Sequence, residues 1–167
     1  YVYWGTQLGI AEMLRSGTTC FSDMYFFMEE TAKAVAETGM RAVLSRGLAG
    51  VSPTAQEALK ENADLFKKWH GFEENRIKVM LGPHAPYTCP EAYLRQVADL
   101  AKELGAQVHM HLCETKNEVE TCIKEKGRTP IAYVNDLGIF DTGCVAAHCV
   151  HITPEDMDIM AAKNVRV

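Results

Sequence analysis

Short apolar segments rich in β-branched residues alternate along the whole chain with segments that have the apolar period of an amphipathic helix. Strands are expected at residues 18–25, 41–46, 77–81, 107–113 and 144–149, with one more beginning at Val165. Helices are expected at residues 7–15, 29–37, 54–70, 90–104, from about 118, at 130–137, and after Thr153. This strict alternation predicts an α/β fold with a parallel sheet and right-handed crossovers.

Two architectures fit this rhythm, a doubly wound open sheet and a TIM barrel. No Gly-rich phosphate loop follows the first predicted strand, which weakens the nucleotide-binding version of the doubly wound fold. No low-complexity linker divides the chain, so we expect a single domain. In a barrel, the chemistry lies at the carboxyl ends of the strands.

The segment from Val108 to Glu114 carries the strongest chemical signal. With a strand period of two, His109, His111 and Cys113 are expected to face the barrel interior, and the apolar residues between them to face the helices. Glu114 comes at the carboxyl end of this strand. Buried polar groups need partners, so either a metal or substrate site or a set of hydrogen-bonded core histidines is expected here.

The neighbouring strands favour a functional site. The preceding strand runs through Gly82-Pro83 into His84, and the following strand ends at His148. Three successive strands therefore each deliver a histidine at the same end. His151 is expected in a loop or helix cap, and Asp23, at the end of the first strand, is expected to be structural.

Several motifs along the chain resemble those of the amidohydrolase superfamily. The resemblance is to the branch of the 5-methylthioadenosine/S-adenosylhomocysteine deaminases, close to the chlorohydrolase-like enzymes. The similarity runs along nearly the whole chain. The motifs that carry it are His111-Leu112-Cys113-Glu114, Ala147-His148-Cys149-Val150-His151, Leu81-Gly82-Pro83-His84-Ala85-Pro86-Tyr87, Ser45-Arg46-Gly47-Leu48 and Gly17-Thr18-Thr19 with Asp23-Met24-Tyr25.

The resemblance implies a partial TIM (β/α)8 barrel of the metal-dependent hydrolase type, in which residues 1–167 hold strands two to six and the start of strand seven. It implies one divalent metal, zinc first and iron as the alternative, with His111 as a ligand. The family's HxH pair on its first strand and its aspartate after the eighth strand have no counterpart in this chain. The His109-x-His111 spacing imitates that pair but falls on a different strand.

The resemblance also implies a mechanism, the hydrolytic deamination of an adenine-type nucleoside. Glu114 would move the proton of the attacking water and touch the substrate, and His148 would hold the reacting oxygen. His84 and Arg46 would contact the substrate. Two structural alternatives stay open, in which Glu114 caps the following helix and Arg46 forms a scaffold ion pair. Some family members carry a second arginine where this chain reads Glu57-Ala58-Leu59, which weakens the case for a carboxylate-bearing substrate.

Composition narrows the partners. A net charge of −5 argues against nucleic-acid or anionic-membrane binding, and no apolar segment is long enough to span a bilayer. The six cysteines form no CxxC pair, which argues against a zinc ribbon and favours a reducing cytoplasm. The expected partner is a small, purine nucleoside-like molecule, with a homo-oligomer as an open alternative.

Three other functions remain open. The first is an amidohydrolase acting on guanine, a cytosine-like base or a triazine. The second is a metal-free hydrolase or lyase, disfavoured because no GxSxG motif or strand-end lysine is visible. The third is an inactive incomplete barrel, since 167 residues fall short of the ~250 typical of a closed one. The chain starts within a helical pattern and stops at a strand, so we expect a piece of a larger protein.

Overall fold

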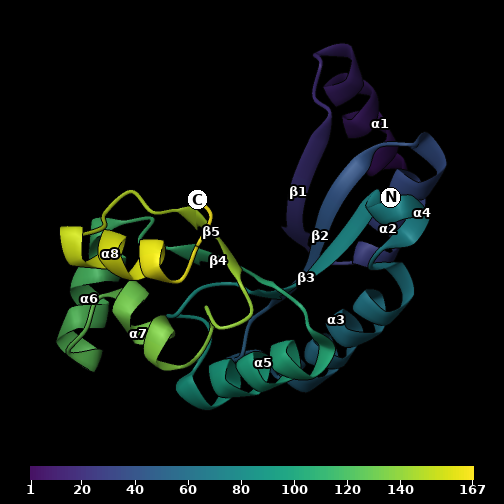
Figure 1. Cartoon of the computed structure of the whole chain (residues 1–167). Coiled ribbons are helices and arrows are strands. Elements are labelled where there is room, and N and C mark those ends of the chain that lie inside the picture. The colour runs from purple at the N-terminus through teal and green to yellow at the C-terminus, as the bar shows by residue number, and fades with distance from the viewer.

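The computed structural model describes all residues from Tyr1 to Val167. Five strands form one parallel sheet in chain order, β1-β2-β3-β4-β5. Figure 1 shows this sheet curving from β1 to β5, as in part of a barrel. The parallel α/β fold predicted from the strand spacing is therefore confirmed, and so is the partial barrel that the family resemblance implies. The strands are β1 Cys20–Tyr25, β2 Arg41–Leu48, β3 Ile77–Pro83, β4 Val108–Leu112 and β5 Cys144–His148.

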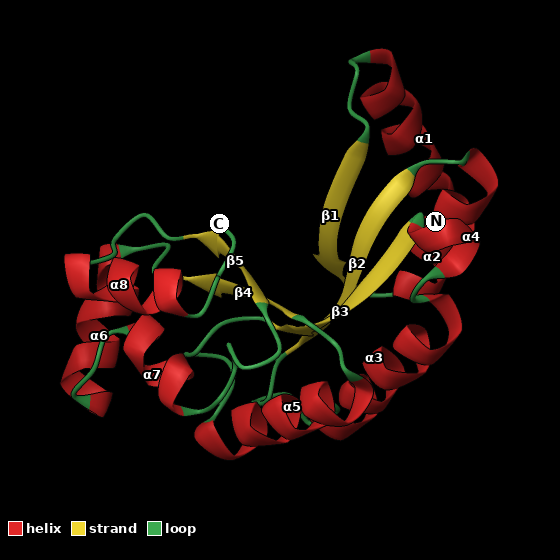
Figure 2. Ribbon diagram, viewed as in Figure 1, coloured by secondary structure: helices red, strands yellow, loops and turns green.

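Helices connect these strands and cover the outer side of the curved sheet (Figure 2). None of them combines the length and apolar character needed to cross a bilayer. They are α1 Val2–Arg15, α2 Met28–Thr38, α3 Ala55–Trp69, α4 Phe72–Asn75, α5 Glu91–Leu104, α6 Lys116–Lys126, α7 Pro130–Asp136 and α8 Pro154–Ala162.

Two apolar clusters join the helices to the sheet. The smaller one packs α1, α2 and α3 against β2 and β3, around residues such as Ile10, Leu44 and Val79. The larger one packs α5, α7 and α8 against β3, β4 and β5. On β4 the alternation follows the prediction, because Val108, Met110 and Leu112 are fully buried in this larger cluster.

The β3–β4 junction is the weakest part of the sheet. These strands share a single paired position, Leu81 with Val108, whereas β2 and β3 are paired at seven positions. Two residues before Leu81, the ring of His70 lies beside β3 where a neighbouring strand would otherwise pair. Its Nδ1 is 3.0 Å from the carbonyl oxygen of Val79 and 3.2 Å from the backbone nitrogen of Val79. Depending on the tautomer, Nδ1 either donates to this carbonyl or accepts from this N–H, so a side chain satisfies one of the two backbone groups that the ladder leaves open.

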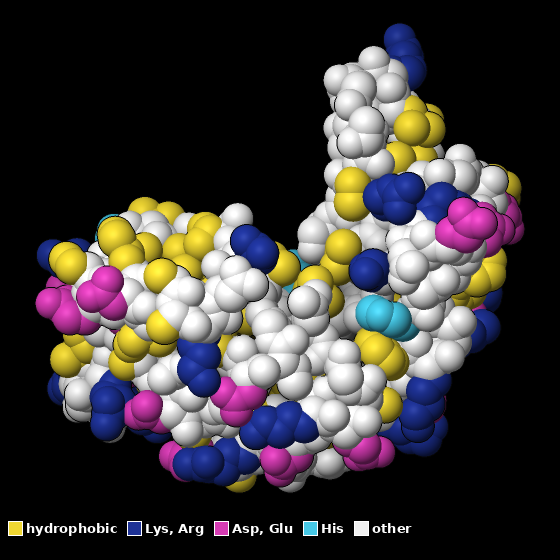
Figure 3. All heavy atoms as spheres, viewed as in Figure 1, with side chains coloured by type: hydrophobic (Ala, Val, Ile, Leu, Met, Phe, Trp, Pro, Cys, Tyr) yellow, Lys and Arg dark blue, Asp and Glu magenta, His cyan; other side chains and the backbone are white.

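The strand expected from Val165 begins beside β5. Arg166 donates its backbone N–H to Cys144 at 2.9 Å and accepts from Ala146 at 2.7 Å, in a parallel bridge. A wide, deep notch separates the part of the molecule that carries α1 from the part that carries α8 (Figure 3).

Candidate active site

Three histidine rings from successive strands lie in a row at the carboxyl end of the sheet. The ring centroid of His111, on β4, is 5.2 Å from that of His84 and 5.3 Å from that of His148. His84 directly follows β3, and His148 is the last residue of β5. The structure thus brings together the three histidines that the sequence singled out.

Two hydrogen bonds fix the orientation of His111. Its backbone N–H donates to the carbonyl oxygen of His84 at 2.9 Å, and its ring Nδ1 lies 3.1 Å from the same oxygen. A carbonyl oxygen only accepts, so Nδ1 carries a proton, and in the neutral ring Nε2 keeps its lone pair. This is the tautomer that a metal-binding histidine uses, with its second nitrogen held by a backbone carbonyl.

Glu114 faces His148 across the strand ends. Its Oε2 atom is 3.7 Å from Nε2 of His148, and both side chains remain partly open to solvent. A carboxylate and an imidazole at this separation can share or exchange a proton through a small adjustment or one water molecule.

Two other residues, Thr115 and Glu118, satisfy the backbone at the start of α6, where Glu114 was a candidate cap. The carboxylate of Glu118 accepts the backbone N–H groups of Cys113 and Glu114, each at 2.9 Å, while the Thr115 side chain accepts from Glu118 N–H at 3.2 Å. Thr115 is therefore the N-cap, and α6 begins at Lys116 rather than near residue 118. The Glu114 carboxylate is left without a capping bond.

Left-handed backbone conformations mark both strand ends. Cys113 has φ 54°, and His148 and Cys149 have φ 74° and 51°. Non-glycine residues seldom adopt this region, and such strain collects at functional sites. Here it ends the strand alternation abruptly, so that Glu114 leaves β4 toward His148.

The same turn makes one prediction wrong. Cys113 was expected to face the interior beside His111, but it is fully buried in the larger apolar cluster, together with residues of α6, α7 and α8. Its left-handed φ rotates the side chain toward the helices. Burial, chiefly, raises the pKa of the Cys113 thiol to about 12.

His84 is held from three sides. Its backbone N–H donates to Leu48 at 2.9 Å, its Nδ1 is 3.0 Å from the hydroxyl of Thr88, and its ring meets Tyr87 edge-on at 5.7 Å. Burial and then the neighbouring His111 lower the pKa of His84, which favours a neutral ring.

His109 lies beneath His111, with ring centroids 5.7 Å apart. It is 6% exposed, and burial lowers its pKa to about 4, so the ring is neutral at physiological pH. Its Nδ1 has no hydrogen-bond partner. The side chain is therefore a buried polar group that this chain alone does not satisfy.

Arg46 lies apart from the histidines. Its Nε donates to Glu61 of α3 at 2.7 Å, another nitrogen donates to the carbonyl of Gly47, and the guanidinium stands 4.9 Å from the centre of the Phe26 ring. These contacts correspond to the scaffold ion pair left open from the sequence. Arg46, Glu61 and Phe26 line a separate cavity of about 480 Å³ between α2 and α3.

The other two candidates have contacts of a structural kind. His151 is exposed in the turn before α8 and donates its backbone N–H to Cys113 at 3.0 Å, while Thr153 caps the helix. Asp23 pairs in register with Leu44 of β2, and burial raises the pKa of its carboxyl.

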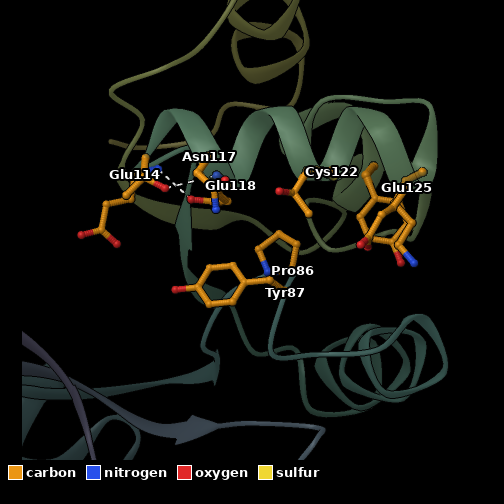
Figure 4. Close-up of a pocket in the computed structure, with 11 residues that line it drawn as sticks. Pro86, Tyr87, Glu114, Asn117, Glu118, Cys122 and Glu125 are labelled. Carbon is orange, nitrogen blue, oxygen red and sulfur yellow. Dashed lines mark hydrogen bonds between the residues drawn. The ribbon is translucent and has the colours of Figure 1, made fainter.

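A groove of about 240 Å³ leads from Glu114 along α6. Figure 4 shows Pro86 and Tyr87 facing the helix across it, with Cys122 and Glu125 farther along. The Glu114 side chain points away from the dashed backbone bonds to Glu118 (Figure 4).

Two supporting residues were missed from the sequence. Glu118 belongs to a Thr-x-x-Glu pattern, Thr115 to Glu118, which is a recognisable helix-start signal. Thr88, which contacts the His84 ring, carries no such signal, because its role depends on how the loop folds.

Within the chain no three His, Cys, Asp or Glu side chains converge closely enough to hold a metal ion. The residues present nevertheless suit one corner of such a site, because His111 offers a free Nε2 and stands beside the Glu114–His148 pair. A complete tetrahedral or five-coordinate site needs further ligands.

Comparisons with known proteins agree with this architecture. A curated 5-methylthioadenosine/S-adenosylhomocysteine deaminase from Caldanaerobacter subterraneus subsp. tengcongensis is 51% identical over 166 residues, covering 98% of this chain and 38% of the relative. The chain thus spans well under half the length of the curated relatives it matches.

Solved structures share the fold. A zinc-bound adenosine deaminase from Xanthomonas campestris superposes with a TM-score of 0.90 at 32% identity, covering 98% of this chain and 38% of that one. An atrazine chlorohydrolase from Arthrobacter aurescens TC1, complexed with zinc, gives 0.83 at 18% identity, covering 96% and 40%. The sequence model of the amidohydrolase family matches residues 1–167, and the chain therefore belongs to the amidohydrolase family.

Proposed function

We propose that this chain is the central part of the catalytic barrel of a metal-dependent hydrolytic deaminase, acting on an adenine-type nucleoside such as 5-methylthioadenosine or S-adenosylhomocysteine. The observation that carries the proposal is the Glu114–His148 pair, 3.7 Å apart, beside a His111 ring whose Nε2 is free. The names of the relatives support the substrate class.

His111 would hold the metal, with the remaining ligands on an HxH strand and an aspartate outside residues 1–167. A bound divalent ion supplies a water molecule that is acidic enough to lose a proton near neutral pH. Zinc is favoured because related structures contain it, and iron is the alternative.

Glu114 then acts as the proton carrier. It accepts a proton from the attacking water as a C–O bond forms at the ring carbon, and passes protons to the ring nitrogen and the departing amine. The C–N bond breaks, ammonia leaves and the ring carbon becomes a carbonyl. His148 donates a hydrogen bond to the reacting oxygen and holds it in place.

His84 and Arg46 would bind the substrate. The His84 ring is neutral, and its second nitrogen is free of the Thr88 contact, so it can bond a ribose hydroxyl. Arg46 would meet the substrate only by loosening its bond to Glu61. This requirement favours substrates with no carboxylate tail.

Two further expectations belong to this proposal. Six cysteines without a disulfide support a reducing, cytoplasmic location. A small nucleoside is the proposed partner, and neither nucleic acid nor membrane is needed.

The test is ammonia release by the full-length gene product from 5-methylthioadenosine, adenosine and S-adenosylhomocysteine, measured beside guanine, cytosine and a triazine. We expect the adenine-type nucleosides to react with the highest kcat/KM. Preferential turnover of guanine, cytosine or the triazine would move the protein to another amidohydrolase activity. No turnover of any of them would overturn the proposal.

A further inference from the structure

Asn62 connects a helix to the end of a strand that leads into the active site. It lies on α3 and is fully buried. Its Nδ2 donates to the carbonyl oxygen of Met80 at 3.0 Å, and its Oδ1 accepts the N–H of Gly82 at 3.0 Å. A buried amide is costly unless its groups are satisfied, and here both ends bind the backbone of β3.

The backbone around Gly82 has little freedom to move. A Cβ atom at this position would lie 2.6 Å from the carbonyl oxygen of Arg46, so β2 and β3 approach closely here. Pro83 follows with a ring that fixes its φ. The direction in which the chain leaves Gly82 therefore sets the position of His84.

His84 passes that position on to His111. The His84 carbonyl oxygen accepts both the backbone N–H and the ring Nδ1 of His111. A shift of Gly82 would displace this oxygen, and the His111 ring would lose the bond that fixes its tautomer.

We propose that Asn62 is a positioning residue for His111, acting through the end of β3 and the carbonyl of His84. The inference rests on the proposed function, in which His111 holds a metal ion. Asn62 touches neither metal nor substrate. Its effect is to keep Nε2 of His111 available and correctly aimed.

The test compares three variants in the full-length gene product. Asn62→Leu keeps the size but removes both hydrogen bonds, and Asn62→Asp keeps the acceptor for Gly82 while losing the donor to Met80. Leu65→Ala is the control, because Leu65 lies on the same helix, is 5% exposed and packs in the smaller apolar cluster. The readouts are zinc affinity by chelator competition, the His111 tautomer by ¹⁵N NMR, and kcat and KM.

We expect Asn62→Leu to weaken zinc binding by up to the about 10- to 100-fold that loss of a direct outer contact to a metal ligand costs, and to lower kcat more than it raises KM. Asn62→Asp should fall between this variant and the wild type. Leu65→Ala should lower the Tm but leave zinc affinity and the His111 tautomer unchanged.

Wild-type zinc affinity and tautomer in both Asn62 variants, or an equal loss in Leu65→Ala, would overturn the inference. If Asn62→Leu does not fold, Asn62→Asp carries the same comparison. A wild-type protein that binds zinc but deaminates no nucleoside would refute the proposed function and leave the zinc-affinity test of Asn62 intact.

Discussion

The Oε2 atom of Glu114 lies 3.7 Å from Nε2 of His148, although Glu114 follows β4 and His148 ends β5. The register of the parallel pair brings them together, because Leu112 lies opposite His148 and the chain turns sharply after Leu112. A base and a hydrogen-bonding imidazole thus meet at one edge of the sheet, with the base supplied by the short turn between β4 and α6.

Glu114→Gln should abolish turnover. The amide cannot accept the water proton, and general base catalysis of this kind contributes about 10²- to 10⁴-fold. Zinc binding and the Tm should stay near the wild-type values, since the carboxylate makes no capping bond. Glu120→Gln is the matched control on α6, where Glu120 pairs only with Lys116. A Glu114→Gln enzyme with full kcat would remove Glu114 from the mechanism.

Glu118→Ala should destabilise the fold by about 1–3 kcal/mol, because two backbone N–H groups lose their acceptor. Urea unfolding monitored by circular dichroism measures this loss. Glu120→Ala, on the exposed side of the same helix, should change the free energy of unfolding by less than about 0.5 kcal/mol. Equal effects of the two substitutions would contradict the role of Glu118 as the acceptor of the Cys113 and Glu114 N–H groups.

Substitutions of His148 should separate backbone strain from chemistry. Asparagine tolerates the left-handed φ of 74°, whereas a β-branched side chain does not. We expect His148→Asn to keep the wild-type Tm and His148→Val to lose about 1–2 kcal/mol, while both variants lose activity. Thermal unfolding distinguishes them. A His148→Val protein as stable as His148→Asn would show that the left-handed backbone is not imposed by the fold.

Cys20 alone should react with a thiol reagent in the native protein at pH 8. It is the one exposed cysteine, whereas burial raises the pKa of Cys113 and Cys144 to about 12 and that of Cys122 to about 11. At pH 8 these thiols stay protonated and unreactive. Urea should expose all six. Labelling of a second cysteine at the rate of Cys20 without urea would refute the burial pattern.

The same buried thiols make the free energy of unfolding depend on pH in the alkaline range. Unfolded thiols lose their protons near pH 8.5, and the buried ones keep theirs to about pH 11–12. The unfolded state therefore binds fewer protons, and the free energy of unfolding should fall as the pH rises above about 8.5. Cys144→Ala should flatten that slope in urea titrations at pH 7–10. An unchanged slope would contradict the assignment.

The sequence predicted the features that follow from local pattern. A strand period of two predicted the strand positions and the inward-facing His109 and His111. Parallel topology predicted that the three histidines lie at one edge of the sheet. The orientation of Cys113 could not be predicted, because it depends on a left-handed φ at a non-glycine residue.

Contacts between residues that are distant in the sequence also could not be predicted. Nothing in the spacing shows that Arg46 pairs with Glu61 or that Asn62 binds the β3 backbone, since each contact joins a helix and a strand through tertiary packing. The helix-start pattern at Thr115 did contain the information that Thr115, and not Glu114, is the capping residue.

Because β3 and β4 share a single paired position, the proposed site spans the junction of the sheet with the fewest paired residues. His84 belongs to the β1–β3 side, and His111, Glu114 and His148 belong to the β4–β5 side. At this end of the sheet the two sides are joined through the His84 carbonyl and the groups of His111. The larger apolar cluster also crosses this junction, since Leu81 packs in it with Val108. A small rotation about the junction would therefore change both the packing of that core and the distance between the proposed substrate-binding histidine and the proposed metal ligand, so contacts that stiffen the junction also affect the proposed chemistry.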